Sequence, residues 1–307
     1  MGDRVYKKQI MHLLERIANS LEIIVDHLVD SDRNIDATSV FARKEGKSVT
    51  RKGSSGSKEA GEWSKGKDIE HFLYSKGIKL QGMDTEVDSC EFLEKIAVFM
   101  GDRYVHIKKL YQTIKKHLNK GDFFDLHLNG ATQLEIASIT QLCTNLHWIA
   151  FLEEYKYDKS SKCIRAKTSK DPKAIKFLTG EWLEYYVKNK VLEAVRSLNL
   201  PVDISYLKNL KIVLSNGDQF EMDLLFKIGD NFFWFETKTG DYQKYIGKYS
   251  KFRKLLELDQ NHTYLILTDI AEAAEQALCS LFKMTVIDIR RFYDSFKFTL
   301  EQLYGAS

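Results

Sequence analysis

Residues 219–240 read QFEMDLLFKIGDNFFWFETKTG, and this stretch decides the predicted fold. Two runs rich in Phe, Leu, Ile and Trp flank Gly229-Asp230-Asn231, a composition typical of a tight turn between antiparallel strands. We therefore predict a β-hairpin. Its geometry places Asp223 and Glu236 on neighbouring strands, where the two carboxylates can meet.

Side-chain alternation predicts which residues of this hairpin share a face. Glu236 and Lys238 lie two positions apart and share one face of the second strand, while Phe233 and Phe235 point to the other. On the first strand, Asp223 is expected opposite one row of apolar side chains: Phe220, Met222, Leu224 and Phe226. The hairpin thus gathers its charged residues beside a core.

Two carboxylates and a lysine are costly to bury without a partner, by several kcal/mol. A divalent cation, Mg²⁺ or Mn²⁺, would resolve this, with Asp223 and Glu236 as hard oxygen ligands and the Thr237 carbonyl completing the shell. Lys238 could then orient or deprotonate a metal-bound water and neutralise charge in the transition state. The alternative is an ordinary cross-strand ion-pair cluster, since a D-x12-E-x-K spacing also arises by chance.

The stretch resembles the motif of the PD-(D/E)XK nuclease superfamily, which has an αβββαβ core with an acid on one strand and (D/E)xK on the next. Met222-Asp223 and Glu236-Thr237-Lys238 match this motif, with methionine in place of proline. FLTGEWLEYYV (177–187), EMDLLF (221–226) and FETKTG (235–240) are similar to the nuclease domain of CRISPR ancillary nucleases activated by cyclic oligoadenylate. The resemblance implies a metal and phosphodiester cleavage.

The resemblance spans roughly residues 170–270 and leaves the N-terminal part uncovered. Those nucleases carry a Rossmann-like sensor domain ahead of the nuclease, whereas residues 1–150 here show neither βαβ alternation nor a glycine-rich phosphate turn. Regulation by a cyclic nucleotide is therefore not predicted. In such domains a glutamate of the first core helix joins the metal site. Glu184 is preferred by its place in the WLE match, and Glu181 stays the alternative.

The N-terminal region divides into a helix and a linker. Residues 1–30 carry a heptad-like apolar seam, predicting a coiled-coil-like helix that could pair two subunits into a homodimer: Ile10, Leu14, Ile17, Leu21, Ile24 and Leu28. Residues 31–67 are rich in Ser, Gly and Lys and predict a flexible basic linker. This linker could collect phosphates by counterion release or be a solvated connection without a specific partner; both interpretations stay open.

Residues 68–169 predict a helical, winged-helix-like domain. Two helices are expected over 86–100 and 102–119, followed by a helix pair and a hairpin around the DKSS turn. A winged helix binds duplex DNA, and the hairpin's basic residues would contact the backbone: Lys156, Lys159, Lys162, Arg165 and Lys167. A helical packing domain with one exposed hairpin is the alternative.

Residues 170–307 predict the nuclease-like domain. A long helix should begin at Asp171-Pro172, with the aspartate as N-cap and the proline in the first turn. Three strands in an antiparallel meander and then βαβ alternation predict a restriction-endonuclease-like mixed sheet flanked by helices. The predicted fold class is therefore α/β, of the α+β kind. Gln243, just after the hairpin, could contact a phosphate or be a surface glutamine.

Composition narrows the function classes. The net charge is +3, the four cysteines are scattered without a CxxC pair, and the chain has no apolar run of about 18 residues. We therefore expect a cytoplasmic protein that meets no membrane. The function predicted from these observations is a metal-dependent nuclease with DNA as its favoured partner, and RNA stays open. The alternative is a catalytically silent nucleic-acid-binding or scaffolding protein that retains the nuclease fold.

Overall fold

The computed structural model describes residues 66–84 and 91–305. The predicted N-terminal helix and nearly all of the predicted linker lie outside these residues. Within the described part, no helix has the length and apolar character needed to cross a bilayer. The first group of elements is α2 (Lys67–Ser75), β1 (Lys79–Asp84), α3 (Glu91–Asp102), α4 (Tyr104–Leu118), β2 (Phe123–His127), α5 (Gln133–Trp148), β3 (Leu152–Asp158) and β4 (Cys163–Thr168).

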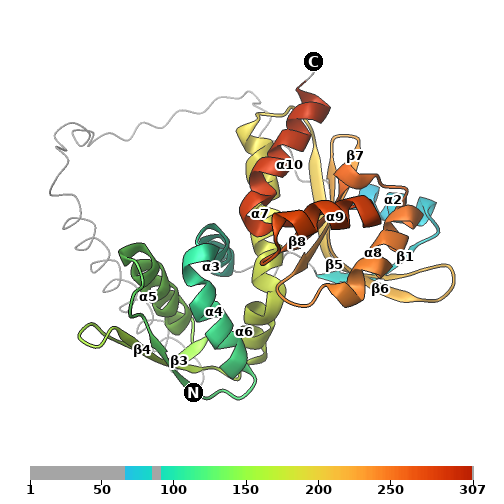
Figure 1. The fold of residues 1–307 in the computed structure, drawn as a ribbon. Helices are drawn as coiled ribbons and strands as arrows, with labels where there is room; N and C mark the ends of the chain where they lie inside the picture. The colour runs from blue at the N-terminus through green and yellow to red at the C-terminus, as the bar shows by residue number, and fades with distance from the viewer. Residues whose placement is uncertain (1–65, 85–90, 306–307) are drawn as a thin grey trace, which may run out of the picture. The chain divides into compact units, whose positions relative to one another are not determined.

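The second group of elements forms most of a large sheet and its covering helices (Figure 1). A single helical run begins with Asp171 as its N-cap, as predicted, and passes through a π-helical turn. The elements are α6 (Pro172–Lys176), η2 (Phe177–Glu181), α7 (Trp182–Ser197), β5 (Ile204–Val213), β6 (Gln219–Ile228), β7 (Asn231–Lys238), α8 (Gln243–Leu256), η3 (Gln260–His262), β8 (Thr263–Leu267), α9 (Glu272–Phe282), β9 (Thr285–Asp288) and α10 (Ile289–Tyr304).

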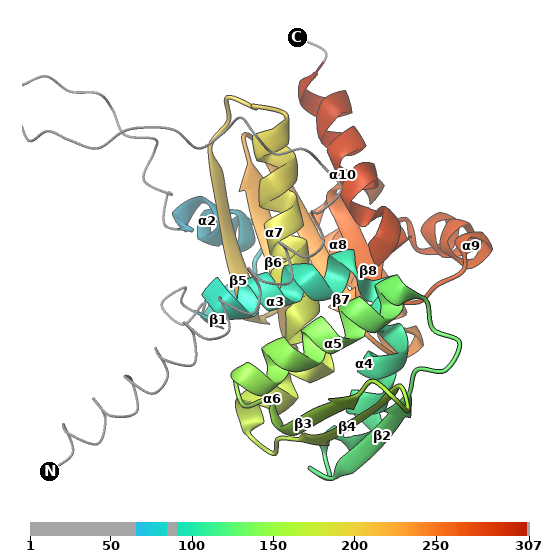
Figure 2. The same cartoon turned by 90° about the vertical axis from the view of Figure 1, so that its left-hand side faces the viewer.

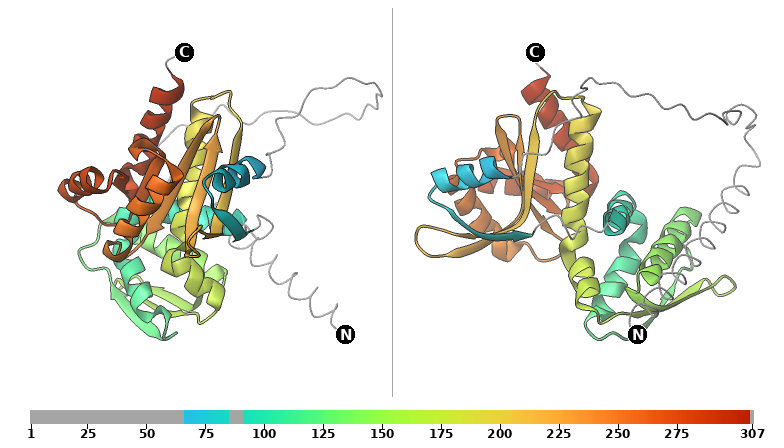
Figure 3. Two further views of the ribbon diagram at one scale, coloured as in Figure 1. Left: turned by 90° about the vertical axis from the view of Figure 1, so that its right-hand side faces the viewer. Right: turned by 180° about the vertical axis from the view of Figure 1, so that it is seen from behind.

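A six-stranded mixed sheet has the order β1-β5-β6-β7-β8-β9. Strands β5, β6 and β7 form the predicted antiparallel meander, and β7, β8 and β9 run parallel through the crossover helices α8 and α9. Helices α7 and α10 bury apolar side chains against one face (Figure 2), and α2 and α8 do so against the other (Figure 3). The predicted mixed sheet flanked by helices is confirmed.

The sheet begins earlier in the chain than predicted. Residues 79–84 fall in the range that the pattern assigns to the helical domain, yet they form β1 and pair antiparallel with β5. Its partner β5 runs from Ile204 to Val213. An edge strand that pairs across more than a hundred residues has no local signature, because its partner lies far away in sequence.

The segment between β1 and α6 contains a second sheet, ordered β2-β4-β3. The predicted hairpin is confirmed, since β3 and β4 pair antiparallel around the DKSS turn. In place of the predicted helix pair there is one helix, α5, which starts with a capping box formed by Thr132 and Glu135. Strand β2 was not anticipated. The winged-helix interpretation of this segment stays a prediction.

The helical segment packs directly against α7, a helix that covers one face of the large sheet. One buried apolar cluster runs without a break from α3, α4 and α5 to α7, α10 and the sheet. Helices α3 and α7 approach each other closely at Gly101. A Cβ at this position would lie 2.1 Å from Cδ2 of Tyr186. A side chain at this position of α3 would therefore force α3 and α7 apart.

Candidate active site

The carboxylates of Asp223 and Glu236 each accept a hydrogen bond from the backbone of the opposite strand of the β6–β7 hairpin. The regular register of the two strands ends at Leu224–Phe235. One position further, the backbone N–H of Asp223 donates to Glu236 Oε1 at 3.1 Å, and the backbone N–H of Thr237 donates to Asp223 Oδ2 at 2.8 Å. Side chains thus replace the backbone ladder where the strands part. The predicted meeting of the two acids is present.

Asp223 reaches this position because the side-chain alternation of β6 changes phase there. Phe220 and Met222 belong to the cluster under α8, whereas Leu224 and Phe226 belong to the cluster under α7. The expectation that these four residues share one face is therefore wrong. The partner strand has an irregularity at the same level, since Asn209 has a left-handed φ of 51°. Asparagine tolerates this conformation better than most residues, so Asn209 is the local signal of the phase change.

Glu236 is an acid in an almost dry environment. It is 1% exposed, and the indole Nε1 of Trp234 donates to its Oε1 at 3.0 Å. Burial, followed by the negative charge of Asp223, raises the pKa of Glu236 to about 8. The ionised form is therefore costly unless a cation lies beside it.

Lys238 is the cation that the hairpin itself supplies. Its Nζ lies 3.6 Å from Asp223 Oδ2 and 3.9 Å from Glu236 Oε2, on the face shared with Glu236 as predicted. The rings of Tyr245 and Tyr249 on α8 lie 5.8 Å from this ammonium. Burial disfavours the charged amine, but the surrounding carboxylates outweigh it, so the pKa of Lys238 is raised. It stays protonated at neutral pH.

The two candidate glutamates of α7 and the turn before it have different surroundings. Glu181 forms ion pairs with Lys176 at 2.9 Å and Lys208 at 3.6 Å. Glu184 instead has a buried Oε2 without a hydrogen-bond partner, and burial together with the charge of Asp223 raises its pKa to about 8. Glu184 is thus the glutamate of the two whose pKa is raised by the charge of Asp223, and its part in a metal site stays a prediction.

Gln243 and Thr237 are the other residues that the sequence pattern predicts at or near the site. Gln243 begins α8 with an exposed side chain, and its backbone N–H donates to Asp241 at 3.1 Å. The Thr237 hydroxyl donates to Asp223 Oδ2 at 3.0 Å. Thr237 therefore holds the orientation of Asp223 with its side chain as well as its backbone N–H.

Within residues 66–84 and 91–305, no three His, Cys, Asp or Glu side chains gather closely enough to hold a metal by themselves. A cation at this site would therefore need oxygen ligands beyond side chains. The donor set is compatible with Mg²⁺, which binds through one or two carboxylates and keeps several waters. The unpartnered, buried oxygen of Glu184 fits this interpretation, because buried polar atoms without partners mark sites where a water or ion is held.

No family model and no curated protein matches the chain. Several solved structures do, among them VC1899 and Can2. Protein VC1899 from Vibrio cholerae has 16% identity and a TM-score of 0.51, with 78% of this chain and 61% of VC1899 covered. Can2 from Sulfobacillus thermosulfidooxidans, in complex with cyclic tetra-adenylate, has 14% identity and a TM-score of 0.51, with 74% and 59% covered.

The chain shares the fold of VC1899 and Can2. It spans about three fifths of the length of each of these proteins. At this level of identity the likeness concerns the fold.

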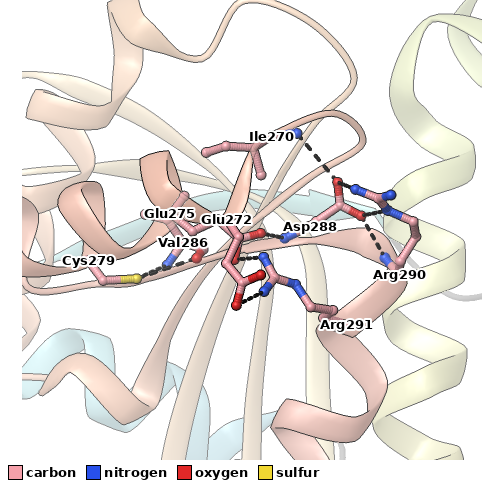
Figure 4. Close-up of polar contacts among 8 residues, drawn as sticks. All are labelled: Ile270, Glu272, Glu275, Cys279, Val286, Asp288, Arg290 and Arg291. Atoms are coloured by element: carbon pink, nitrogen blue, oxygen red, sulfur yellow. Dashed lines mark hydrogen bonds and ion pairs between the residues drawn. The ribbon is translucent and has the colours of Figure 1, made fainter.

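A second polar cluster lies at the end of β9, two strands away from the motif (Figure 4). Arg290 donates through Nε to the fully buried Asp288 at 2.6 Å, and Arg291 pairs with Glu272 and Glu275. Of these residues, Glu272, Arg290 and Arg291 border a hollow of about 290 Å³. Because three acids neutralise the two arginines, this cluster fastens α9 and α10 to β9 rather than offering free positive charge.

Proposed function

We propose that this chain is a divalent-metal-dependent endonuclease that hydrolyses phosphodiester bonds of nucleic acid, with DNA favoured over RNA. The observation that carries the proposal is the buried pair Asp223 and Glu236 with Lys238 at 3.6 and 3.9 Å. An acid pair of this kind is unfavourable without a cation. The rival interpretation, an exposed cross-strand ion-pair cluster, is at odds with the 1% exposure of Glu236.

We assign the metal to Asp223, Glu236 and the carbonyl of Thr237, with Glu184 supporting it. Mg²⁺ or Mn²⁺ bound there would lower the pKa of a water and polarise the phosphate. Glu236 is held for this task by two donors, the Trp234 indole and the Asp223 backbone. Both bonds end on Oε1, so they fix the orientation of the carboxylate and leave Oε2 for a cation, which reduces the reorganisation needed on binding.

Lys238 has two tasks in this proposal. As a protonated amine it neutralises charge that develops on the phosphate, and it orients the attacking water. Tyr245 and Tyr249 face its ammonium and restrict where it can move. The Lys238 charge also holds the acid pair together before the metal binds.

The shared fold supports the same conclusion. Can2 was solved with cyclic tetra-adenylate, and the motif of this chain resembles nucleases activated by such molecules. A CRISPR-related nuclease in prokaryotic defence is therefore the setting that we propose. The preference for DNA depends on the predicted wing, whose residues Lys156, Lys159 and Lys162 are exposed.

The test is a cleavage assay on plasmid DNA, single-stranded DNA and RNA with Mg²⁺, Mn²⁺ or EDTA. We expect metal-dependent cleavage of DNA that falls at least about 100-fold in Lys238→Ala and Glu236→Gln. The matched controls are Lys211→Ala and Glu221→Gln, which change exposed residues of β5 and β6. Binding without cleavage under every metal would favour the silent nucleic-acid-binding alternative.

A further inference from the structure

Helix α4 of the helical segment places a lysine against the exit of the catalytic strand β7. Lys115 Nζ donates to the carbonyl of Thr239 at 3.0 Å and to its Oγ1 at 3.1 Å. Thr239 directly follows Lys238. A residue more than 120 positions away in sequence thus lies beside the end of the motif, a contact that no local pattern could reveal.

A further hydrogen bond holds the residue that Lys115 contacts in place. The Thr239 hydroxyl, which accepts from Lys115, donates in turn to the carbonyl of Thr179 at 2.6 Å. Thr179 belongs to the π-helical turn that leads to Glu184, and π-turns of this kind are frequent at functional sites. Thr239 therefore links Lys115 of α4 to Thr179 of η2, directly after the end of β7.

Lys115 has no anionic partner in the part of the chain that is described. Lys108 on the same helix pairs with Asp269 at 2.5 Å, but no carboxylate of residues 66–84 and 91–305 lies within ion-pair distance of Lys115. Burial lowers its pKa, in contrast to the raised pKa of Lys238. An ammonium has three N–H donors, and the two described bonds leave one for a ligand.

We propose that Lys115 binds a phosphate of the nucleic-acid substrate next to the scissile one. This inference rests on the proposed nuclease function and extends it to the helical segment. Lys115 is a half-buried cation without a described anionic partner, and it bonds Thr239, the residue after Lys238. Its charge and its place beside the motif match a backbone phosphate. Lys115 would then align the strand, while Lys238 acts at the reacting phosphate.

The test removes, one at a time, the positive charge of Lys115 and the negative charge of the substrate phosphate that it is proposed to bind. Lys115→Gln keeps a donor for Thr239 but loses the positive charge, and Lys116→Gln changes the exposed neighbour on α4 as a matched control. Oligonucleotides with a single methylphosphonate at successive positions lose one phosphate charge each. We expect the Lys115→Gln change to raise KM by about tenfold with a smaller effect on kcat.

If Lys115 binds the phosphate, the effects of Lys115→Gln and of the methylphosphonate should not add. A merely structural role of Lys115 would leave the two effects additive. With wild type and Lys116→Gln, one methylphosphonate beside the scissile phosphate should weaken cleavage by about tenfold, and with Lys115→Gln the same substitution should have little effect. Lys115→Arg should restore part of this sensitivity. Equal sensitivity in all variants would overturn the assignment, whatever their melting temperatures.

The outcomes also separate this inference from the proposed function. If wild type cleaves but Lys115→Gln behaves like Lys116→Gln, only the Lys115 assignment fails. If wild type cleaves no substrate, the nuclease proposal fails, and the same comparison is made by equilibrium binding of the oligonucleotides. Loss of methylphosphonate sensitivity in Lys115→Gln then still supports the contact, and unchanged sensitivity rejects it.

Discussion

Replacing Glu236 with glutamine should make the metal-free protein more stable at neutral pH. Glu236 has a pKa raised to about 8 in the folded protein, against 4.5 for an ordinary glutamate. Between these values the unfolded chain releases a proton that the folded chain retains. Folding stability therefore falls as pH rises through this window, by about 1.4 kcal/mol per pH unit.

The size of the effect follows from that window. Between pH 5 and pH 7 the wild type should lose about 3 kcal/mol of stability relative to the glutamine variant. Glutamine still accepts from the Trp234 indole and the Asp223 backbone, so the local hydrogen bonds survive. Only the ionisation of residue 236 is removed.

The assay is urea unfolding in EDTA at several pH values between 5 and 8. Glu221→Gln on the exposed side of β6 is the matched control, and its stability should follow that of the wild type. A difference between wild type and Glu236→Gln that stays constant across this pH range would refute the reasoning. It would mean that Glu236 ionises as a solvated carboxyl does.

Three further predictions concern metal binding, the hydrogen bond from Trp234 to Glu236, and the packing of α3 against α7. Adding Mg²⁺ or Mn²⁺ at about 100 times its Kd should raise the stability of wild type by about 3 kcal/mol, and calorimetry should show no such gain for Asp223→Asn. Trp234→Phe removes a donor to a buried acid, so unfolding should show a loss of about 1–3 kcal/mol, and cleavage assays should show lower activity. Gly101→Ala should lower thermal stability by about 1–3 kcal/mol because its Cβ meets Tyr186; an unchanged melting temperature would contradict the close approach of α3 and α7.

Much of the candidate site follows from local rules. The turn at 229–231 is enough to predict that Asp223 and Glu236 lie on neighbouring strands, and the two-residue period of β7 places Glu236 on the same face as Lys238. The change of phase in β6 at Asp223 was not predicted. The N-cap Asp171 and the following proline likewise marked the start of the long helix. These features depend on residues that are close in sequence, which is why their pattern can be read there.

Other features depend on contacts between distant parts of the chain. Strand β1 joins the sheet through β5, and Lys115 meets Thr239 across 124 positions. The choice between Glu181 and Glu184 was open in the sequence, because both lie within one helical turn. Only the packed structure shows that Glu181 forms ion pairs with two lysines and that the buried Glu184 has its pKa raised by burial and by the charge of Asp223.

The hairpin, its acids and its lysine can be predicted from neighbouring residues, because a turn and the alternation along a strand are local properties. The tertiary structure alone decided how dry these groups are and which partners they lack. Burial raises the pKa of Glu236, and it depends on Trp234, α8 and the sheet together. These charged residues form a candidate active site only because packing removes water from around them. Such desolvation needs both the sheet and the helix that covers it.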